Sequence, residues 1–311
     1  MYIANYFILR FKTSMKVSFN NNSISFKSYN AKTVTPCVGN PLLVNSLEHY
    51  TCFFRNYDTL KFTSDYVKKT FCNGANIAEF GCSQGQKSYS LLMLLDDVNQ
   101  NKKFKIVGYD FAKPISDNKK QHFKVNMFNR NERIIFNDEK LKSVFDKYFK
   151  KIESKEVLSD HLVMPNLDKT VGVIDFKEGN ILNIDKILPN DKNSIIVFQN
   201  ALHHILQDSK NSIHDNFEIV YNLFQKIHNK LPKDGLFVLG TLFDEHQYSK
   251  HLEGESRLIY QNNERIRVFD SSRIHGFLKT IGFEPIFYES VDPVFKENIF
   301  LPTVWKKINR L

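Results

Sequence analysis

The sequence predicts an α/β fold with a doubly wound, mainly parallel sheet. Short apolar runs alternate along the chain with segments of helical periodicity. Each run is continuously apolar rather than alternating, which is typical of strands that are covered on both faces. A bend with two glycines separates the first run from the helix after it, as at the ligand site of such sheets.

The predicted elements follow from these runs in chain order. The predicted strands span residues 76–80, 104–110, 171–176, 194–198, 236–240 and, as the last strand, 285–288. The predicted helices span residues 56–72, 85–97, 217–230 and 274–281, and the charged stretch 117–160 is partly helical, with helical spacing between Leu141 and Phe149.

We expect three regions. Residues 1–46 are an N-terminal extension of unknown role, in which short strands are predicted. Residues 47–245 hold the main α/β domain, and residues 246–311 form a C-terminal part that packs on the same sheet. A chain of 311 residues is long enough for such a domain with an appendage.

Composition predicts a soluble globular protein, with 42% hydrophobic and 25% charged residues. The four cysteines form no C-x-x-C pair. Their pattern argues against a disulfide framework or a zinc site and predicts a reducing, cytoplasmic location. No stretch approaches the roughly 20 apolar residues of a membrane helix, so we expect no membrane span.

The net charge of +9 raises the question of a nucleic-acid partner. Lysines alternate with acidic residues, however, and no long run of one sign stands out. Nucleic acid is therefore not an expected partner.

The most informative motif is IAEFGCSQGQKSYS at residues 77–90. A strand containing Glu79 breaks at Gly81, turns through Ser83 and reaches Gly85, where a helix begins. Glycine lets a ligand approach the backbone, and the first N–H groups of the helix are free to bind it. The motif lacks the third glycine of G-x-G-x-x-G and the Gly-Lys-Ser/Thr of a P-loop. Its spacing favours S-adenosylmethionine over a dinucleotide, although an ordinary strand-to-helix turn has the same outline.

Polar residues at the ends of other predicted strands suit the same ligand. Asp110 follows Gly85 by slightly more than the roughly 20 residues expected for an acid that binds ribose, unless it merely caps the next turn. Asn180 and Ile181 are candidates for the edge and the face of an adenine. Gln199 and Asn200 end the fourth strand, where a transferred methyl group would lie.

Two adjacent histidines follow this strand. Neighbouring side chains point in different directions, so His203 and His204 make a poor metal pair and no metal site is predicted. His204 is a candidate general base, and a purely structural histidine is the alternative.

Taken in order, several segments resemble the CheR-type methyltransferases, which use S-adenosylmethionine to esterify glutamate side chains of bacterial chemotaxis receptors. Residues 51–55 (TCFFR) resemble T-x-F-F-R, and residues 81–91 (GCSQGQKSYSL) resemble G-C-S-T-G-E-E-P-Y-S-L. Residues 176–182 (FKEGNIL) and 231–240 (LPKDGLFVLG) are similar to two further family segments. The resemblance covers about residues 47–245 and implies a class I, Rossmann-like methyltransferase domain there.

The resemblance also implies roles for residues. Thr51 and Arg55 would close over the cofactor, with Arg55 near the reacting end. Asp110 would bind the ribose, and a second group of residues would line the adenine and methionine sides. These are Asn180, Ile181, Gln199 and Asn200. Arg55 and His204 are the catalytic candidates.

The chain departs from the family at several positions. Gln86 and Lys87 replace a pair of glutamates, Gln199 replaces an arginine and His204 replaces a tyrosine. The helical N-terminal domain that contacts receptors in the family has no counterpart in residues 1–46. The acceptor is therefore open between a protein carboxylate, another oxygen or nitrogen nucleophile, and a small molecule. A non-catalytic protein that kept the cofactor fold is a further alternative.

Overall fold

The computed structural model describes residues 51–98, 103–110, 122–126, 128–129, 131–152, 160–199, 201–202, 213–239, 256–261, 264–288 and 303–308. All of them belong to one compact unit, Pro36–Leu311. The strands predicted within residues 1–46 lie outside this described part, and the division into three regions stays a prediction.

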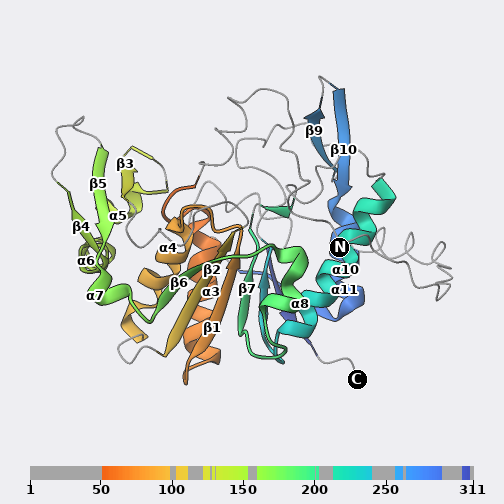
Figure 1. Ribbon diagram of the computed structural model, residues 1–311, viewed down its shortest axis with the longest axis horizontal. Coiled ribbons are helices and arrows are strands. Elements are labelled where there is room, and N and C mark those ends of the chain that lie inside the picture. Colours follow the sequence, from red (N-terminus) through yellow and green to blue (C-terminus); the bar gives the residue numbers. More distant parts are fainter. Residues whose placement is uncertain are drawn as a thin grey trace, which may run out of the picture. The chain divides into compact units, whose positions relative to one another are not determined.

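A seven-stranded sheet forms the centre of this unit, as Figure 1 shows. Its strand order is β11-β12-β8-β7-β1-β2-β6. The strands are β1 (Ala75–Phe80), β2 (Phe104–Asp110), β6 (Ile174–Glu178), β7 (Ile195–Val197), β8 (Leu236–Val238), β11 (Phe283–Ile286) and β12 (Val304–Lys307). The pairs from β8 to β6 are parallel, and β12 is antiparallel to both of its neighbours. The predicted doubly wound, mainly parallel sheet is confirmed.

The strand order reverses at β1. Glu79 of β1 pairs with Gly108 of β2 on one side and with Val197 of β7 on the other. The loops that leave the carboxyl ends of β1 and β7 therefore diverge to opposite faces, and ligands bind at such a point in doubly wound sheets.

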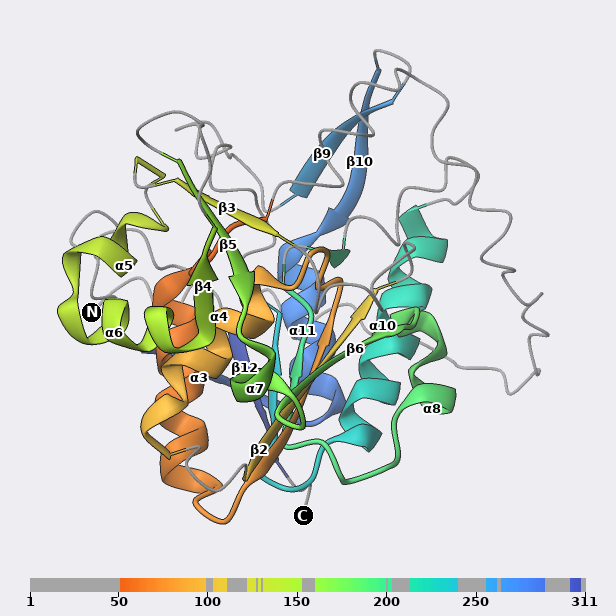
Figure 2. The same cartoon turned by 60° about the vertical axis from the view of Figure 1, so that its left-hand side comes forward.

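Helices cover both faces of the sheet. Helices α3 (Tyr57–Thr70) and α4 (Gln86–Leu94) cover one face, and α8 (Ile184–Ile187), α10 (Ile213–Lys230) and α11 (Ser271–Ile281) cover the other, as Figure 2 shows. Successive side chains of a strand point to opposite faces of the sheet, so the same strands contribute residues to both cores. Ile195 and Val197 face the α4 side, whereas Ile196 between them faces the α10 side.

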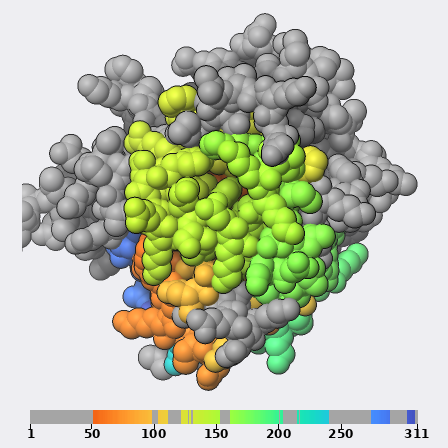
Figure 3. Space-filling view, turned by 90° about the vertical axis from the view of Figure 1, so that its left-hand side faces the viewer, coloured from red at the N-terminus to blue at the C-terminus, as the bar shows by residue number. Residues whose placement is uncertain are grey.

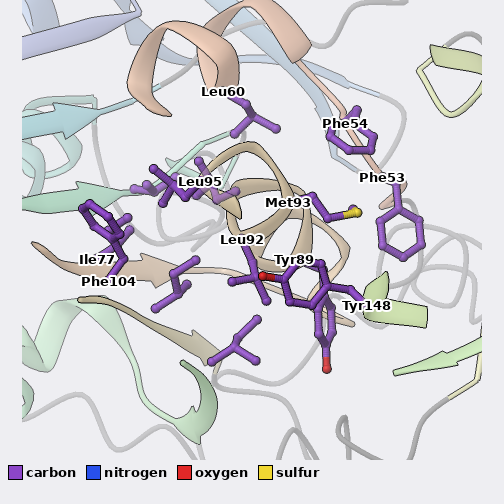
Figure 4. Packing of buried hydrophobic residues seen from close by; sticks show 14 of the residues in the cluster. Phe53, Phe54, Leu60, Ile77, Tyr89, Leu92, Met93, Leu95, Phe104 and Tyr148 are labelled. Atoms are coloured by element: carbon purple, nitrogen blue, oxygen red, sulfur yellow. The ribbon is translucent and has the colours of Figure 1, made fainter. Parts of the chain in front are cut away.

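Figure 4 shows the core on the α4 side. Leu60 of α3 and Leu92 of α4 pack with Ile77 and Phe104 of the sheet, and all four are at most 1% exposed. Burial of such side chains contributes on the order of 2 kcal/mol each. This face therefore anchors the helix that follows the glycine turn.

A second, antiparallel sheet is inserted in the chain between β2 and β6. It has the order β3-β5-β4, with β3 (Phe123–Asn126), β4 (Phe149–Lys151) and β5 (Asp160–Pro165). Its helices are α5 (Arg133–Asn137), α6 (Glu139–Tyr148) and α7 (Leu167–Thr170). Figure 3 shows that this segment, here called the insert, forms a continuous surface on one face of the molecule.

The structure corrects several predicted elements. Helix α4 ends at Leu94 and a short 3₁₀ helix follows (Asp96–Val98), so the predicted helix to Asp97 is too long. The helix before Phe149 exists, but Phe149 itself begins β4. β12 follows the strand that was predicted to be the last. The antiparallel pair β9 (Ser256–Gln261) and β10 (Glu264–Asp270) was not predicted.

Two predictions from composition, on disulfides and on membrane spans, can be compared with the described part of the chain. Cys52, Cys72 and Cys82 are free thiols. No helix among the described residues is long and apolar enough to cross a membrane.

Candidate functional site

The glycine turn after β1 has a backbone that few side chains tolerate. Gly81, Ser83 and Gly85 have φ angles of 69°, 49° and 90°. A Cβ atom at Gly85 would lie 2.5 Å from Cζ of Phe176. Position 85 therefore requires glycine twice over, for its backbone angle and for the close approach of the ring. The turn brings bare backbone to the carboxyl edge of the sheet.

Asp110 holds this turn from the neighbouring strand. The backbone N–H of Ser83 donates to Oδ2 of Asp110 at 2.7 Å, and the Asp110 side chain is largely buried. The N–H groups of Gly81 and Cys82 donate to the carbonyl oxygen of Tyr109 at 2.8 and 3.2 Å. The predicted ribose-binding acid therefore lies against the predicted glycine turn.

Glu79 is a fully buried carboxylate beneath the turn. Ser88 Oγ donates a hydrogen bond to its Oε2, and Lys87 Nζ lies 3.4 Å from its Oε1. Burial raises the pKa of Glu79, while the Lys87 ammonium and the Ser88 hydroxyl oppose that rise. The lysine that replaces a family glutamate is thus the counter-ion of Glu79.

Three buried side chains at this edge carry polar atoms without a hydrogen bond in the described part of the chain. They are Oε1 of Gln86 and both amide atoms of Gln199, together with Oε1 of Glu79, which has an ion pair with Lys87 at 3.4 Å but no hydrogen bond. All three side chains are at most 4% exposed. Buried polar groups are normally paired, and an orphan costs about 1–3 kcal/mol. The cluster fits a ligand with several N–H or O–H donors, such as the ammonium, ribose and adenine groups of S-adenosylmethionine.

Gln199 lies near the glycine turn, as the strand register predicts. Glu79 pairs with Val197, which places the residues after β7 beside those after β1. A Cβ atom at Gly81 would lie 3.0 Å from Cβ of Ala201, so the chain after β7 runs close to the turn. Asn200 and His204, the other candidates in this stretch, lie outside the described residues.

The segment of residues 51–56 is anchored on α4. The Phe54 N–H donates to Ser90 Oγ at 2.9 Å. Phe54 and Asn56 have φ angles of 57° and 59°, so both residues that flank Arg55 are left-handed. Thr51 and Arg55 are both half-buried. The structure therefore places Thr51 and Arg55, the two predicted closing residues, on a segment bound to α4.

The loop after β6 also reaches the site. The N–H of Gly179 donates to the carbonyl oxygen of Asp110 at 2.8 Å. Asn180 Oδ1 accepts from the N–H of Leu182 at 2.9 Å and caps the 3₁₀ helix Ile181–Asn183. Ile181 is 4% exposed and belongs to the core on the α10 side. Asn180 thus lies next to the Asp110 backbone, and Ile181 is a core residue.

Sequence reasoning missed Ser88, Ser90 and Glu132. Ser88 and Ser90 lie in the helix after the turn, where spacing from Gly85 could have indicated inward-facing hydroxyls. Glu132 binds the backbone of Phe53 across 79 positions of the chain. No local pattern predicts such a contact. Among the described residues, no group of His, Cys, Asp or Glu could hold a metal ion.

A match to a known protein family agrees with this geometry. The family model described as CheR methyltransferase, SAM binding domain, matches residues 49–257. No curated protein matches the chain.

Solved structures with similarity to the chain are distant. One is 1,6-didemethyltoxoflavin-N1-methyltransferase of Burkholderia thailandensis with bound 1,6-didemethyltoxoflavin and S-adenosylhomocysteine, at 13% identity over 81% of this chain and 79% of that chain, with a TM-score of 0.42. Another is a SAM-dependent methyltransferase of Methanosarcina mazei, at 12% identity over 76% of this chain and 94% of that chain, with a TM-score of 0.39. The family match itself covers most of the chain. The chain therefore belongs to the CheR methyltransferase family and is an S-adenosylmethionine-dependent methyltransferase.

Proposed function

We propose that this enzyme transfers a methyl group to a carboxylate of its acceptor, as the CheR-type resemblance implies. The observation that carries the proposal is the anchoring of residues 51–56 on α4, with Arg55 held between two left-handed residues. A guanidinium is the side chain best suited to hold a carboxylate, because its fork matches two carboxylate oxygens.

The cofactor is held, in this proposal, by groups that the structure brings to the carboxyl edge of the sheet. Asp110 accepts hydrogen bonds from the ribose hydroxyls. Oε1 of Gln86 accepts from the ammonium group, together with Oε1 of Glu79 beside its ion pair with Lys87, and the Gln199 amide pairs with the reacting end. We expect further contacts from Thr51 and Arg55, which close over the cofactor, from Asn180 and Ile181, and from Asn200, which lies outside the described residues.

S-adenosylmethionine supplies a methyl group that its sulfonium makes electrophilic. Arg55 orients the acceptor carboxylate in line with this group, and the segment 51–56 excludes water from it. An ionised carboxylate is itself the nucleophile, so no residue of the chain needs to remove a proton. An acceptor hydroxyl or amine would need a base, and His204 is the candidate for that role.

The chemistry of the product tests the proposal. The protein is incubated with methyl-labelled cofactor and a cell lysate, and the labelled material is treated with base. A methyl ester releases its label as volatile methanol, whereas a methyl ether or methylamine keeps it. We expect base-labile label that depends on intact Asp110; base-stable label would contradict the carboxylate acceptor, and mass spectrometry then identifies the methylated atom.

A further inference from the structure

We propose that Glu132 is a positioning residue that fixes Arg55 relative to α4 and thereby links the insert to the cofactor site. The inference rests on the proposed role of Arg55. Glu132 lies on the insert, directly before α5, and is far from the glycine turn in the sequence. Its carboxylate nevertheless binds the segment that carries Arg55.

The first observation is the burial and bonding of the Glu132 carboxylate. Its side chain is 3% exposed. Oε1 accepts from the N–H of Phe53 at 3.1 Å, and Oε2 accepts from the N–H of Asn126, at the end of β3, at 2.7 Å. One carboxylate thus joins the main-chain segment 51–56 to a strand of the insert. Hydrogen bonds to a buried charge are among the strongest in proteins.

The second observation is that consecutive N–H groups of residues 51–56 bind two different parts of the protein, the insert and α4. The Phe53 N–H donates to Glu132, and the next N–H, of Phe54, donates to Ser90 Oγ on α4. Ser90 Oγ donates in turn to the carbonyl oxygen of Gln86, in the first turn of α4. Arg55 therefore follows directly after a junction between the insert and α4.

The third observation is the backbone on either side of Arg55. Phe54 and Asn56 both adopt left-handed φ angles, which residues other than glycine rarely do. Such conformations persist only where the surroundings determine them. The hydrogen bonds from the N–H groups of Phe53 and Phe54 hold this backbone on the side before Arg55.

The side chain of Phe53 strengthens the link to the insert. Its ring makes edge contacts with Phe123, Phe145 and Phe149, at centroid distances of 5.6, 5.7 and 5.2 Å. All three belong to the insert. A shift of the insert would therefore move the backbone at Phe53, and Arg55 with it, unless the Glu132 bond breaks.

A double-mutant cycle in cofactor binding tests the inference. Glu132→Gln keeps the shape of the side chain but replaces one acceptor oxygen with an NH₂ donor, so one of the two N–H partners loses its acceptor. Affinity for S-adenosylhomocysteine is measured by calorimetry in four proteins: the unaltered chain, Glu132→Gln, Arg55→Ala and the double variant. We expect Glu132→Gln to weaken binding on the order of tenfold in the unaltered background, and less than twofold when Arg55 is absent.

Asp138→Ala is the matched control. Asp138 caps α6 within the same insert by accepting from the N–H of Leu141, so its loss destabilises the insert. Unlike Glu132, Asp138 forms no hydrogen bond to residues 51–56 in the described part of the chain. We expect the control to lower the midpoint of unfolding and leave cofactor affinity within twofold. Equal losses of affinity for Glu132→Gln in both backgrounds would overturn the inference, since a merely structural role acts without Arg55.

Two other results would also overturn it. They are an unchanged affinity in Glu132→Gln and an unchanged affinity in Arg55→Ala. The base-lability assay reports on the acceptor carboxylate separately. An additive cycle together with ester formation therefore rejects the role of Glu132 and leaves the proposed function standing.

Discussion

At the scale of single residues, the buried pair of Glu79 and Lys87 is the costliest feature of the site. Both side chains are at most 7% exposed, and removing two charges from water costs several kcal/mol per ion. Their attraction and the Ser88 hydrogen bond offset this cost only while both partners are present. The pair is therefore sensitive to the loss of either charge.

Lys87→Met should destabilise the protein in a pH-dependent way. Burial raises the pKa of Glu79 above its unfolded value, and loss of the Lys87 ammonium raises that pKa further. A carboxyl whose pKa is raised by folding stabilises the fold when protonated and loses that contribution as the pH rises above its unfolded value near 4.5. We expect a deficit of about 3 kcal/mol at pH 7 that shrinks toward pH 5, measured by urea unfolding.

Lys61→Met is the control for this variant. Lys61 pairs with Asp65, but both side chains are more than two-fifths exposed, so the pair contributes little in water. We expect a change below about 1 kcal/mol. A deficit of Lys87→Met that stays constant from pH 5 to pH 7 would contradict the role assigned to the ion pair.

Two glycines of the chain should respond to alanine in opposite directions. At Gly85, alanine meets a left-handed φ and the ring of Phe176, so we expect a loss of about 2–4 kcal/mol and weaker cofactor binding. At Gly276, within α11, no atom apart from the neighbouring helix backbone lies within 4 Å of the added Cβ, so alanine should stabilise by about 0.5–1 kcal/mol. Urea denaturation of both variants measures the difference, and similar changes at the two positions would refute the argument.

The scale of helices and strands shows what the sequence could and could not predict. β1 and β2 were predicted within one residue because most of the side chains in each are apolar and buried, on both faces of the sheet. β3 reads F-K-V-N, and β4 begins where α6 ends. These short strands form only by pairing with β5, so their pairing is absent from the local pattern.

The same limit applies to the site. That Glu79, Gly81, Gly85 and Asp110 lie close together could be predicted because strand ends of a parallel sheet converge at one edge. Glu132 could not, because its contact depends on how the insert folds back on residues 51–56.

His275 of α11 should make the fold sensitive to acid. Burial lowers its pKa to about 4, with a smaller contribution from the Lys279 charge, and its ring contacts that of Trp305. A depressed folded pKa means that stability falls as the pH drops from the unfolded value of about 6.5 toward 4.

His275→Phe keeps a ring against Trp305 but cannot take up a proton. The unaltered protein should lose on the order of 2 kcal/mol relative to this variant between pH 7.5 and pH 4.5. Chemical denaturation at both pH values measures the difference. A stability difference between the two proteins that stays constant with pH would contradict this prediction. It would mean that the folded and unfolded chains bind a proton at His275 equally well.

At the scale of the whole molecule, residues near both ends of the described chain pack on the central sheet and contact each other. β12 pairs with β8, and Trp305 of β12 is fully buried in the core on the α10 side. Tyr288 OH forms hydrogen bonds of 2.6 Å with Thr59 of α3 and with Thr303. Helix α3 thus packs with α4 in one core and forms a hydrogen bond with the C-terminal segment.

Removal of residues 246–311 should therefore abolish cooperative folding, although this segment contains only the last few residues of the family match, which ends at residue 257. The shortened chain would expose the edge of β8, the core face that Trp305 covers and the hydroxyl of Thr59. A single Tyr288→Phe substitution, which removes only the hydroxyl, should cost about 1–2 kcal/mol and keep a cooperative transition. Near-ultraviolet circular dichroism during urea unfolding distinguishes the two: we expect no sharp transition in the shortened chain, and a cooperative one would mean that residues 47–245 fold as a domain of their own.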